Sequence, residues 1–383
     1  MSTSQRILLT GARAPVTLDL ARMLQANGHK VFVADTTQAH VCRFSNAVKR
    51  SFVVPAPIEG TLSFVIALKD IVCAEQIDCL IPTCEEVFAI AQHMDVLTKH
   101  CRVFCEAIDR LEPLHNKATF IELLQSFGLP FPQTLKLTSP ADVEAALERW
   151  ERVVFKPVYS RFARDVLICH RSDTERVRCV LPSASDPWVA QQYIEGERLC
   201  TYTVAEEGRV LAHTSYPVEH CLGRIGSALA YRNVHHRAAL ALVAELVNKL
   251  DYTGQLSLDL IVGPDGVPVP IECNPRATSG LHLFRAEDRL DQAFLGGIPA
   301  KTPPEGRHAH VALPLLLMGG KHRFKAWTQG RDVIFSSRDP LPALISPLLL
   351  LYFAIKGLKL GMSMTQASTY DIEWNGHDIC ASV

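Results

Sequence analysis

The chain has 383 residues, a length that predicts two or three packed domains rather than one hydrophobic core. Its 39 Lys and Arg residues nearly balance 40 Asp and Glu residues, and no long run of one sign stands out, which argues against a nucleic-acid binder. The twelve Cys residues are scattered without a Cys-x-x-Cys pair, which favours small buried thiols in a reducing cytoplasm over zinc ligands or disulfides.

The N-terminal residues lack the charged region, apolar core and cleavage site of a signal peptide, and they are expected to form a first strand. The most apolar stretch, 341–355, is about 15 residues long and contains Pro347, which is short of the ~20 residues that span a bilayer. We therefore expect a cytoplasmic protein without a membrane span, in which this stretch forms a buried or interfacial helix.

The first 112 residues alternate between strand and helix patterns. The expected elements are strands at 7–10, 31–34 and 79–81 and helices at 15–27, at 62–75 and from Thr83 onward. Glu86, three residues after Thr83, fits a capping box. This alternation predicts a parallel, doubly wound sheet, which binds ligands at the carboxyl ends of its strands. Gly11 alone does not make the three-glycine fingerprint of a dinucleotide site.

Strand patterns dominate the middle of the chain. Asn116 and Ser139 are expected to cap two helices, with the loop-like stretch 129–137 between them. The remaining expected elements are strands at 153–157, 166–170, 188–194, 200–205 and 210–215, a helix at 235–250, and a hairpin with strands at 256–262 and 267–271. The Gly-Pro-Asp-Gly turn at 263–266 joins the two hairpin strands.

The hairpin carries the most informative polar residues. Asp259 lies on its first strand, and Glu272 and Asn274 share a face at the end of the second because strand side chains alternate. Mg²⁺ prefers such oxygen ligands and is usually held by one or two carboxylates together with nucleotide phosphates. From spacing alone, a hairpin end whose polar residues face solvent remains the alternative.

Residues spread along the chain resemble the ATP-grasp superfamily, especially the branch with carbamoyl-phosphate synthase large chains, biotin carboxylases and carboxylate-amine ligases. The resemblance rests on Lys117, Lys156, the run Gln191-Gln192-Tyr193-Ile194-Glu195-Gly196-Glu197, Asp259, and Glu272-Cys273-Asn274-Pro275-Arg276. It implies an α/β fold in three parts. These are a Rossmann-like pre-ATP-grasp parallel sheet (1–112), a two-lobed α+β ATP-grasp domain (113–298) with a lid at about 153–185, and a small C-terminal segment (299–383).

The resemblance also implies roles for individual residues. Lys117 and Lys156 would contact ATP phosphates, the backbone of Gln191, Gln192, Tyr193 and Ile194 would read adenine, Asp259, Glu272 and Asn274 would hold Mg²⁺ or Mn²⁺, and Arg276 would join Lys156 at the reacting groups. The loop 158–165 lacks the glycines usual in the family, so Ser160, Arg161 and Arg164 are expected to bind phosphate through side chains, or else to face solvent. Glu197 replaces the usual ribose-binding acid.

An acceptor pocket is implied beyond the metal ligands. Its candidates are Arg276, Ser279 and Gly280 for a substrate carboxylate, His282 as a base or a structural residue, and Arg224 and Arg232 as anion binders or surface residues. The segment 300–383 is the least informative part, and 371–376 is expected to form a hairpin turn.

The resemblance predicts an ATP-dependent ligase that phosphorylates a carboxylate to an acylphosphate and couples it to an amine. The alternatives are a bicarbonate-activating enzyme, although the chain has one such core and no Met-Lys biotinylation motif, or a non-catalytic nucleotide binder. Small-molecule carboxylate and amine substrates are the expected partners, and relatives suggest a homodimer.

Overall fold

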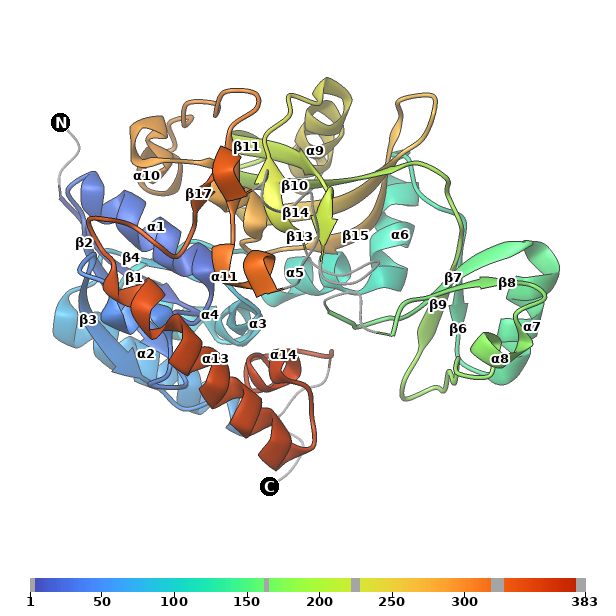
Figure 1. Ribbon diagram of the computed structural model, residues 1–383, viewed down its shortest axis with the longest axis horizontal. Helices are drawn as coiled ribbons and strands as arrows, with labels where there is room; N and C mark the ends of the chain where they lie inside the picture. The colour runs from blue at the N-terminus through green and yellow to red at the C-terminus, as the bar shows by residue number, and fades with distance from the viewer. Residues whose placement is uncertain (1–3, 162–164, 222–227, 318–326, 377–383) are drawn as a thin grey trace.

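A parallel sheet opens the structure. The computed structural model describes residues 4–161, 165–221, 228–317 and 327–376 (Figure 1). The sheet has the order β3-β2-β1-β4-β5 with all its neighbours parallel. Its strands are β1 (Arg6–Thr10), β2 (Lys30–Asp35), β3 (Val48–Val53), β4 (Cys79–Ile81) and β5 (Arg102–Val103), and its helices are α1 (Pro15–Ala26), α2 (Thr61–Glu75), α3 (Glu86–Gln92) and α4 (Met94–Thr98). The doubly wound parallel sheet expected from the sequence is confirmed.

Two local expectations for this sheet need correction. The strand β3 was not predicted, because Lys49, Arg50 and Ser51 interrupt its apolar pattern. The third helix begins at Glu86 rather than at Thr83. The Thr83 hydroxyl donates to the Thr10 carbonyl at 2.7 Å instead of capping the helix, so only the carboxylate half of the expected capping box forms.

An antiparallel lobe stands at the right of Figure 1. Its sheet has the order β6-β9-β7-β8, and its elements are β6 (Thr134–Leu137), α7 (Pro140–Arg149), β7 (Arg152–Pro157), β8 (Leu167–His170), α8 (Thr174–Val177) and β9 (Trp188–Gln192). The lobe has its own core, in which Trp150, Phe155 and Trp188 are buried. The expected loop at 129–137 therefore contains a strand, β6, which pairs with β9.

A second antiparallel sheet carries the hairpin. Its order is β11-β10-β14-β15, with β10 (Glu197–Glu206), β11 (Arg209–Pro217), β14 (Gly254–Val262) and β15 (Pro268–Asn274). The helices α5 (Ile108–His115), α6 (Lys117–Ser126) and α9 (Arg237–Leu250) share a core with it. The apolar face of α9 that the sequence predicts is buried, including Leu242, Val243 and Leu246.

The last part of the chain completes a fourth sheet, which is mostly antiparallel. It then crosses back over the parallel sheet formed by β1 to β5. This sheet has the order β12-β13-β16-β17, with β12 (His220–Cys221), β13 (Ala228–Arg232), β16 (His308–His310) and β17 (Arg331–Asp332). The remaining helices are α10 (Leu290–Leu295), α11 (Ala312–Leu317), α13 (Leu341–Leu360) and α14 (Met364–Ala367).

The helix α13 differs from its prediction. It has 20 residues and continues through Pro347, so it is longer than the stretch recognised in the sequence. Within the described part of the chain it is the one helix long and apolar enough to cross a membrane, and only 22% of its most apolar window is buried. The helix is thus largely unburied in the described structure, and its length removes the reason given from the sequence against a membrane span.

Candidate active site

Lys117 and Glu272 meet between α6 and the hairpin. Asn116 caps α6 by accepting from the backbone N–H groups of Ala118 and Thr119, which fixes the first turn where Lys117 lies. The Lys117 side chain is buried, its Nζ donates to the Ser160 carbonyl at 3.1 Å, and it lies 3.6 Å from Oε1 of Glu272. The Glu272 side chain is more accessible than that of Lys117.

Lys156 brings a second buried cation to the hairpin. Its Nζ donates to Oε1 of Gln191 at 2.7 Å and to the Ile271 carbonyl at 3.4 Å. Burial, partly offset by the charge of Glu272, lowers the pKa of Lys156 to about 8. Within the described part of the chain, the amide Nε2 of Gln191 has no partner. A buried cation with neutral direct partners, next to an unsatisfied donor, is suited to an anionic ligand.

Asp259 and Glu272 are the register partners across the hairpin. The register shifts directly after this pair, next to Pro270, which lacks a backbone donor. Burial, and then the negative charge of Glu272, raise the pKa of Asp259. Its Oδ1 accepts from the Cys200 thiol at 3.0 Å, and burial raises the pKa of that thiol well above its usual value.

The acidic pair fits a magnesium site of the kind expected. A divalent cation between two carboxylates relieves their mutual repulsion. Asn274 ends β15, the strand that carries Glu272. The described residues contain no group of three His, Cys, Asp or Glu side chains suited to a metal, so the remaining ligands would be Asn274, water and phosphate oxygens.

Arg276 and Arg161 converge on one buried carboxylate, that of Glu85. Nη2 of Arg276 lies 3.0 Å from Oδ1 of Asn274 and 3.5 Å from Oε1 of Glu85, and Nε of Arg161 lies 2.5 Å from Oε2 of Glu85. Burial alone would raise the pKa of Glu85, but Arg161, His115 and Arg276 outweigh burial and lower it. Glu85 was not among the residues expected from the sequence, although its position after the carboxyl end of β4 was a signal.

The C-terminal segment holds Arg161 from the other side. Nη1 of Arg161 donates to Oδ1 of Asn375 at 2.7 Å and lies 3.5 Å from Oε2 of Glu373, and Nη2 donates to the Trp374 carbonyl. The Trp374 indole stacks on Phe88, with ring centroids 4.8 Å apart. The residues 371–376 are irregular rather than a hairpin turn. In this structure Arg161 can reach phosphate only by exchanging these partners.

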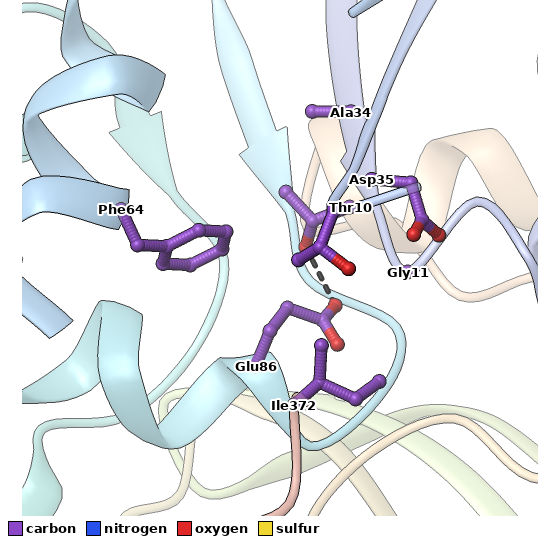
Figure 2. A pocket seen from close by; sticks show the side chains of 8 residues that line it. Thr10, Gly11, Ala34, Asp35, Phe64, Glu86 and Ile372 are labelled. Atoms are coloured by element: carbon purple, nitrogen blue, oxygen red, sulfur yellow. Dashed lines mark hydrogen bonds between the residues drawn. The ribbon is translucent and has the colours of Figure 1, made fainter. Parts of the chain in front are cut away.

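The same segment covers the carboxyl ends of β1 and β2. Figure 2 shows the small pocket there, lined by Thr10, Gly11, Ala34, Asp35, Thr36, Phe64, Glu86 and Ile372. Glu86 accepts from the Thr10 hydroxyl at 2.6 Å, and burial raises its pKa. Arg13 links Asp35 at 2.6 Å to Asp371 at 2.7 Å. The expected ligand edge of the sheet is thus partly closed by the chain itself.

The run expected to read adenine lies at the end of β9. The backbone N–H of Gln192 donates to the Gln133 carbonyl at 2.9 Å and that of Tyr193 to the Arg152 carbonyl at 3.2 Å. These two N–H groups are therefore engaged within the protein. Glu197 begins β10 and is exposed.

The acceptor candidates lie beyond the hairpin, in different settings. Ser279 and Gly280 open the 3₁₀ turn Ser279–Leu283, and the Gly280 carbonyl accepts from Thr214 at 3.0 Å. His282 is buried and its Nδ1 lies 2.6 Å from Asp19, which makes a structural contact. Arg232 pairs with Glu219 at the surface. Arg164 and Arg224 lie outside the described residues.

Comparisons with known proteins give one consistent result. The profile of the ATP-grasp domain matches residues 114–280. An L-amino acid ligase from Bacillus licheniformis is 19% identical, with a TM-score of 0.61 over 77% of this chain and 75% of that one. An N5-carboxyaminoimidazole synthetase from Staphylococcus aureus, complexed with ADP, is 13% identical, with a TM-score of 0.64 over 80% and 82%.

A third solved structure is the biotin carboxylase domain dimer of 2-oxoglutarate carboxylase from Hydrogenobacter thermophilus, in complex with MgADP, ADP and bicarbonate. It is 14% identical, with a TM-score of 0.56 over 73% of this chain and 65% of that one. No curated protein matches the chain. The pre-ATP-grasp sheet followed by ATP-grasp lobes, which the sequence led us to expect, is the fold these structures share.

Proposed function

We propose a reaction for this chain on the premise that it belongs to the ATP-grasp superfamily, whose domain it carries at residues 114–280. The chain is an ATP-dependent enzyme of this superfamily, and the finer proposal is that it is an ADP-forming carboxylate-amine ligase. It transfers the terminal phosphoryl group of ATP to a substrate carboxylate, and an amine then displaces phosphate from the acylphosphate to give an amide.

The observation that carries this proposal is the arrangement of charge around the hairpin. Lys117 and Lys156 are buried cations on one side, the Asp259–Glu272 pair lies on the neighbouring strands, and Arg276 extends from the end of β15. Phosphoryl transfer asks the protein mainly for positioning and for positive charge around the transferring oxygens. These residues supply both at one place.

Each residue has one task in this scheme. Lys117 and Lys156 hold phosphate oxygens, Asp259, Glu272 and Asn274 hold Mg²⁺ or Mn²⁺, and the metal supplies positive charge to the phosphoryl group. Arg276 neutralises the carboxylate being phosphorylated and faces the developing charge. The loop that carries Ser160, which Lys117 contacts, and the backbone of Gln191, Gln192, Tyr193 and Ile194 position the nucleotide. Ser279 and Gly280 border the acceptor, while Arg161 fastens its loop to Glu85 until ligand displaces it.

Bicarbonate is the second candidate for the activated carboxylate. The biotin carboxylase domain named above holds bicarbonate together with MgADP, and its fold resembles that of this chain. At 14% identity this likeness concerns the fold alone, so the substrate has to be found by assay.

The test is ADP release from Mg-ATP across amino acids and other small carboxylates, singly and in pairs with amines, with bicarbonate as a separate arm. A Glu272→Ala variant is the silent control, and hydroxylamine trapping detects the acylphosphate. We expect one carboxylate and amine pair to stimulate ADP release and yield a hydroxamate. AMP formation, or stimulation by bicarbonate alone, would remove the ligase assignment, and light scattering on the same sample reports whether the enzyme is a homodimer.

A further inference from the structure

The helix α13 carries a broad apolar face that the rest of the described structure leaves uncovered. The exposed apolar side chains of this face are Leu341, Leu344, Leu348, Leu351, Tyr352, Ile355 and Leu358, and Leu360 at the end of the helix is exposed as well. Leu344, Leu348 and Leu358 are 70%, 62% and 83% exposed. The opposite face, with Ser346, Phe353 and Gly357, is buried against the protein. The face therefore belongs to a fixed surface helix rather than to a detached one.

The width of this face helps to identify its occupant. At 100° per residue, Leu344, Leu348, Leu351, Tyr352 and Leu358 cover about 120° of the helix circumference. A coiled-coil seam with a second copy of the chain needs only a narrow stripe, whereas a helix lying in a membrane interface buries a broad face. An aromatic side chain at the edge of the face, as Tyr352 provides, is typical of membrane interfaces.

The charges around α13 point to the same occupant. The helix has no acidic residue, and its two charged residues are Lys356 and Lys359. The exposed Arg338 precedes it, and the neighbouring 3₁₀ turn contributes the exposed Arg43. The acids beside it are largely occupied: Asp339 binds Arg22 at 2.9 Å and Asp371 binds Arg13. Glu59 differs from these two acids because it is exposed. It lies near Tyr370, beside Lys356.

We propose that α13 is an interfacial helix that docks this protein on an anionic membrane surface, with its leucine face at the acyl boundary and Lys359 and Arg338 at lipid phosphates. The inference is independent of the reaction proposed above, because it rests on no residue of the active site. The apolar face supplies the binding energy, and the cations select anionic lipid.

The experiment is flotation of the full-length protein with vesicles of phosphatidylcholine alone and of equal parts phosphatidylcholine and phosphatidylglycerol. We expect the protein to float with the mixed vesicles, more weakly in high salt, and to stay behind with phosphatidylcholine alone. Leu348→Glu should lower binding by roughly tenfold or more, and Lys359→Gln by about fivefold. Leu240→Glu on α9, which is 40% exposed in the wild type, is the matched control and should float like the wild type.

Thermal unfolding and ATP binding of each variant establish that it is folded, and light scattering gives its mass. Failure of the wild-type protein to float with the mixed vesicles overturns the proposal. So does a result in which Leu348→Glu converts a dimer to a monomer while flotation stays unchanged, because α13 would then pair with a second copy. Equal loss of flotation in Leu240→Glu would show that the helix has no special role.

Discussion

Asp259 and Glu272 are direct register partners on β14 and β15, which places two carboxylates side by side at the end of a buried hairpin. Side chains so placed have Cβ atoms roughly 5 Å apart. Burial and Glu272 raise the pKa of Asp259, so its charged form is disfavoured in the folded protein without a cation. The free protein therefore disfavours two charges at this place, and the proposed function would relieve the repulsion with a divalent cation.

Asp259→Asn should separate these two effects. The asparagine keeps an oxygen for the Cys200 thiol but removes one negative charge, so the melting temperature of the nucleotide-free protein should rise at pH 7. Mg-ATP should then no longer stabilise the variant, and turnover should fall by about 10²- to 10³-fold. Calorimetry with and without Mg-ATP measures both. Glu245→Gln on α9 is the control, and an Asp259→Asn protein stabilised by Mg-ATP like the wild type would contradict the metal assignment.

Lys156 gives a pH prediction. Because burial lowers its pKa to about 8, the free protein loses this cation as pH rises through 8. If Lys156 binds phosphate, the Kd for ATP should increase by about tenfold per pH unit above 8 and be nearly constant below it. Arginine stays protonated throughout this range. The Kd of Lys156→Arg for ATP should therefore not rise up to pH 9. At pH 7 we expect this variant to bind ATP more weakly than the wild type, and isothermal titration measures both.

A flat ATP affinity from pH 7 to 9 in the wild-type protein would show that Lys156 is not a phosphate ligand. Its burial already excludes a lysine that snorkels from a strand edge, and the same series tests a purely structural role, because Lys156→Met would then leave ATP affinity unchanged.

The sequence predicted the core strands of the parallel sheet and the hairpin because their information is local. Alternating apolar residues and the Gly-Pro-Asp-Gly turn suffice to bring Asp259 beside Glu272. The contact of Arg161 with Glu85 joins residues 76 apart, and its contacts with Trp374 and Asn375 join residues more than 200 apart. No periodicity encodes such contacts, so Arg161 was assigned to phosphate, and the C-terminal residues that hold it were expected to form a hairpin.

Gly280 is predicted to be intolerant of any side chain. A Cβ atom at this position would lie 2.5 Å from Cβ of Tyr202 and 2.9 Å from Oγ1 of Thr214, both of which belong to buried strands. Gly280→Ala should lower the free energy of unfolding by about 1–3 kcal/mol through overpacking and shift the turn that bears Ser279. Urea denaturation measures the first effect, and the KM for the carboxylate substrate, once identified, measures the second. Gly266 lies in the hairpin turn, where an added Cβ atom would meet no neighbour. Gly266→Ala therefore reports the backbone effect of losing a glycine without the steric effect.

Asp19 gives a prediction for acid stability. It is buried on α1, where Arg331 donates to both its oxygens at 2.9 and 2.8 Å and His282 lies at 2.6 Å. Burial alone would raise the pKa of Asp19, but these partners lower it well below its usual range. A carboxyl with a depressed folded-state pKa contributes stability above its unfolded pKa of about 3.9 and loses it as pH falls further.

Asp19→Asn should therefore lower the free energy of unfolding at pH 7 by about 3–5 kcal/mol, because Arg331 is left without its carboxylate. The difference between wild type and variant should shrink below about pH 4, where the Asp19 carboxyl of the unfolded wild-type chain takes up a proton while that of the folded protein stays ionised. Urea unfolding at several pH values measures this difference, with Asp70→Asn on the exposed face of α2 as the control. A difference that stays constant down to pH 2 would mean that the ionised form of Asp19 contributes no stability, and that the triad acts through packing alone.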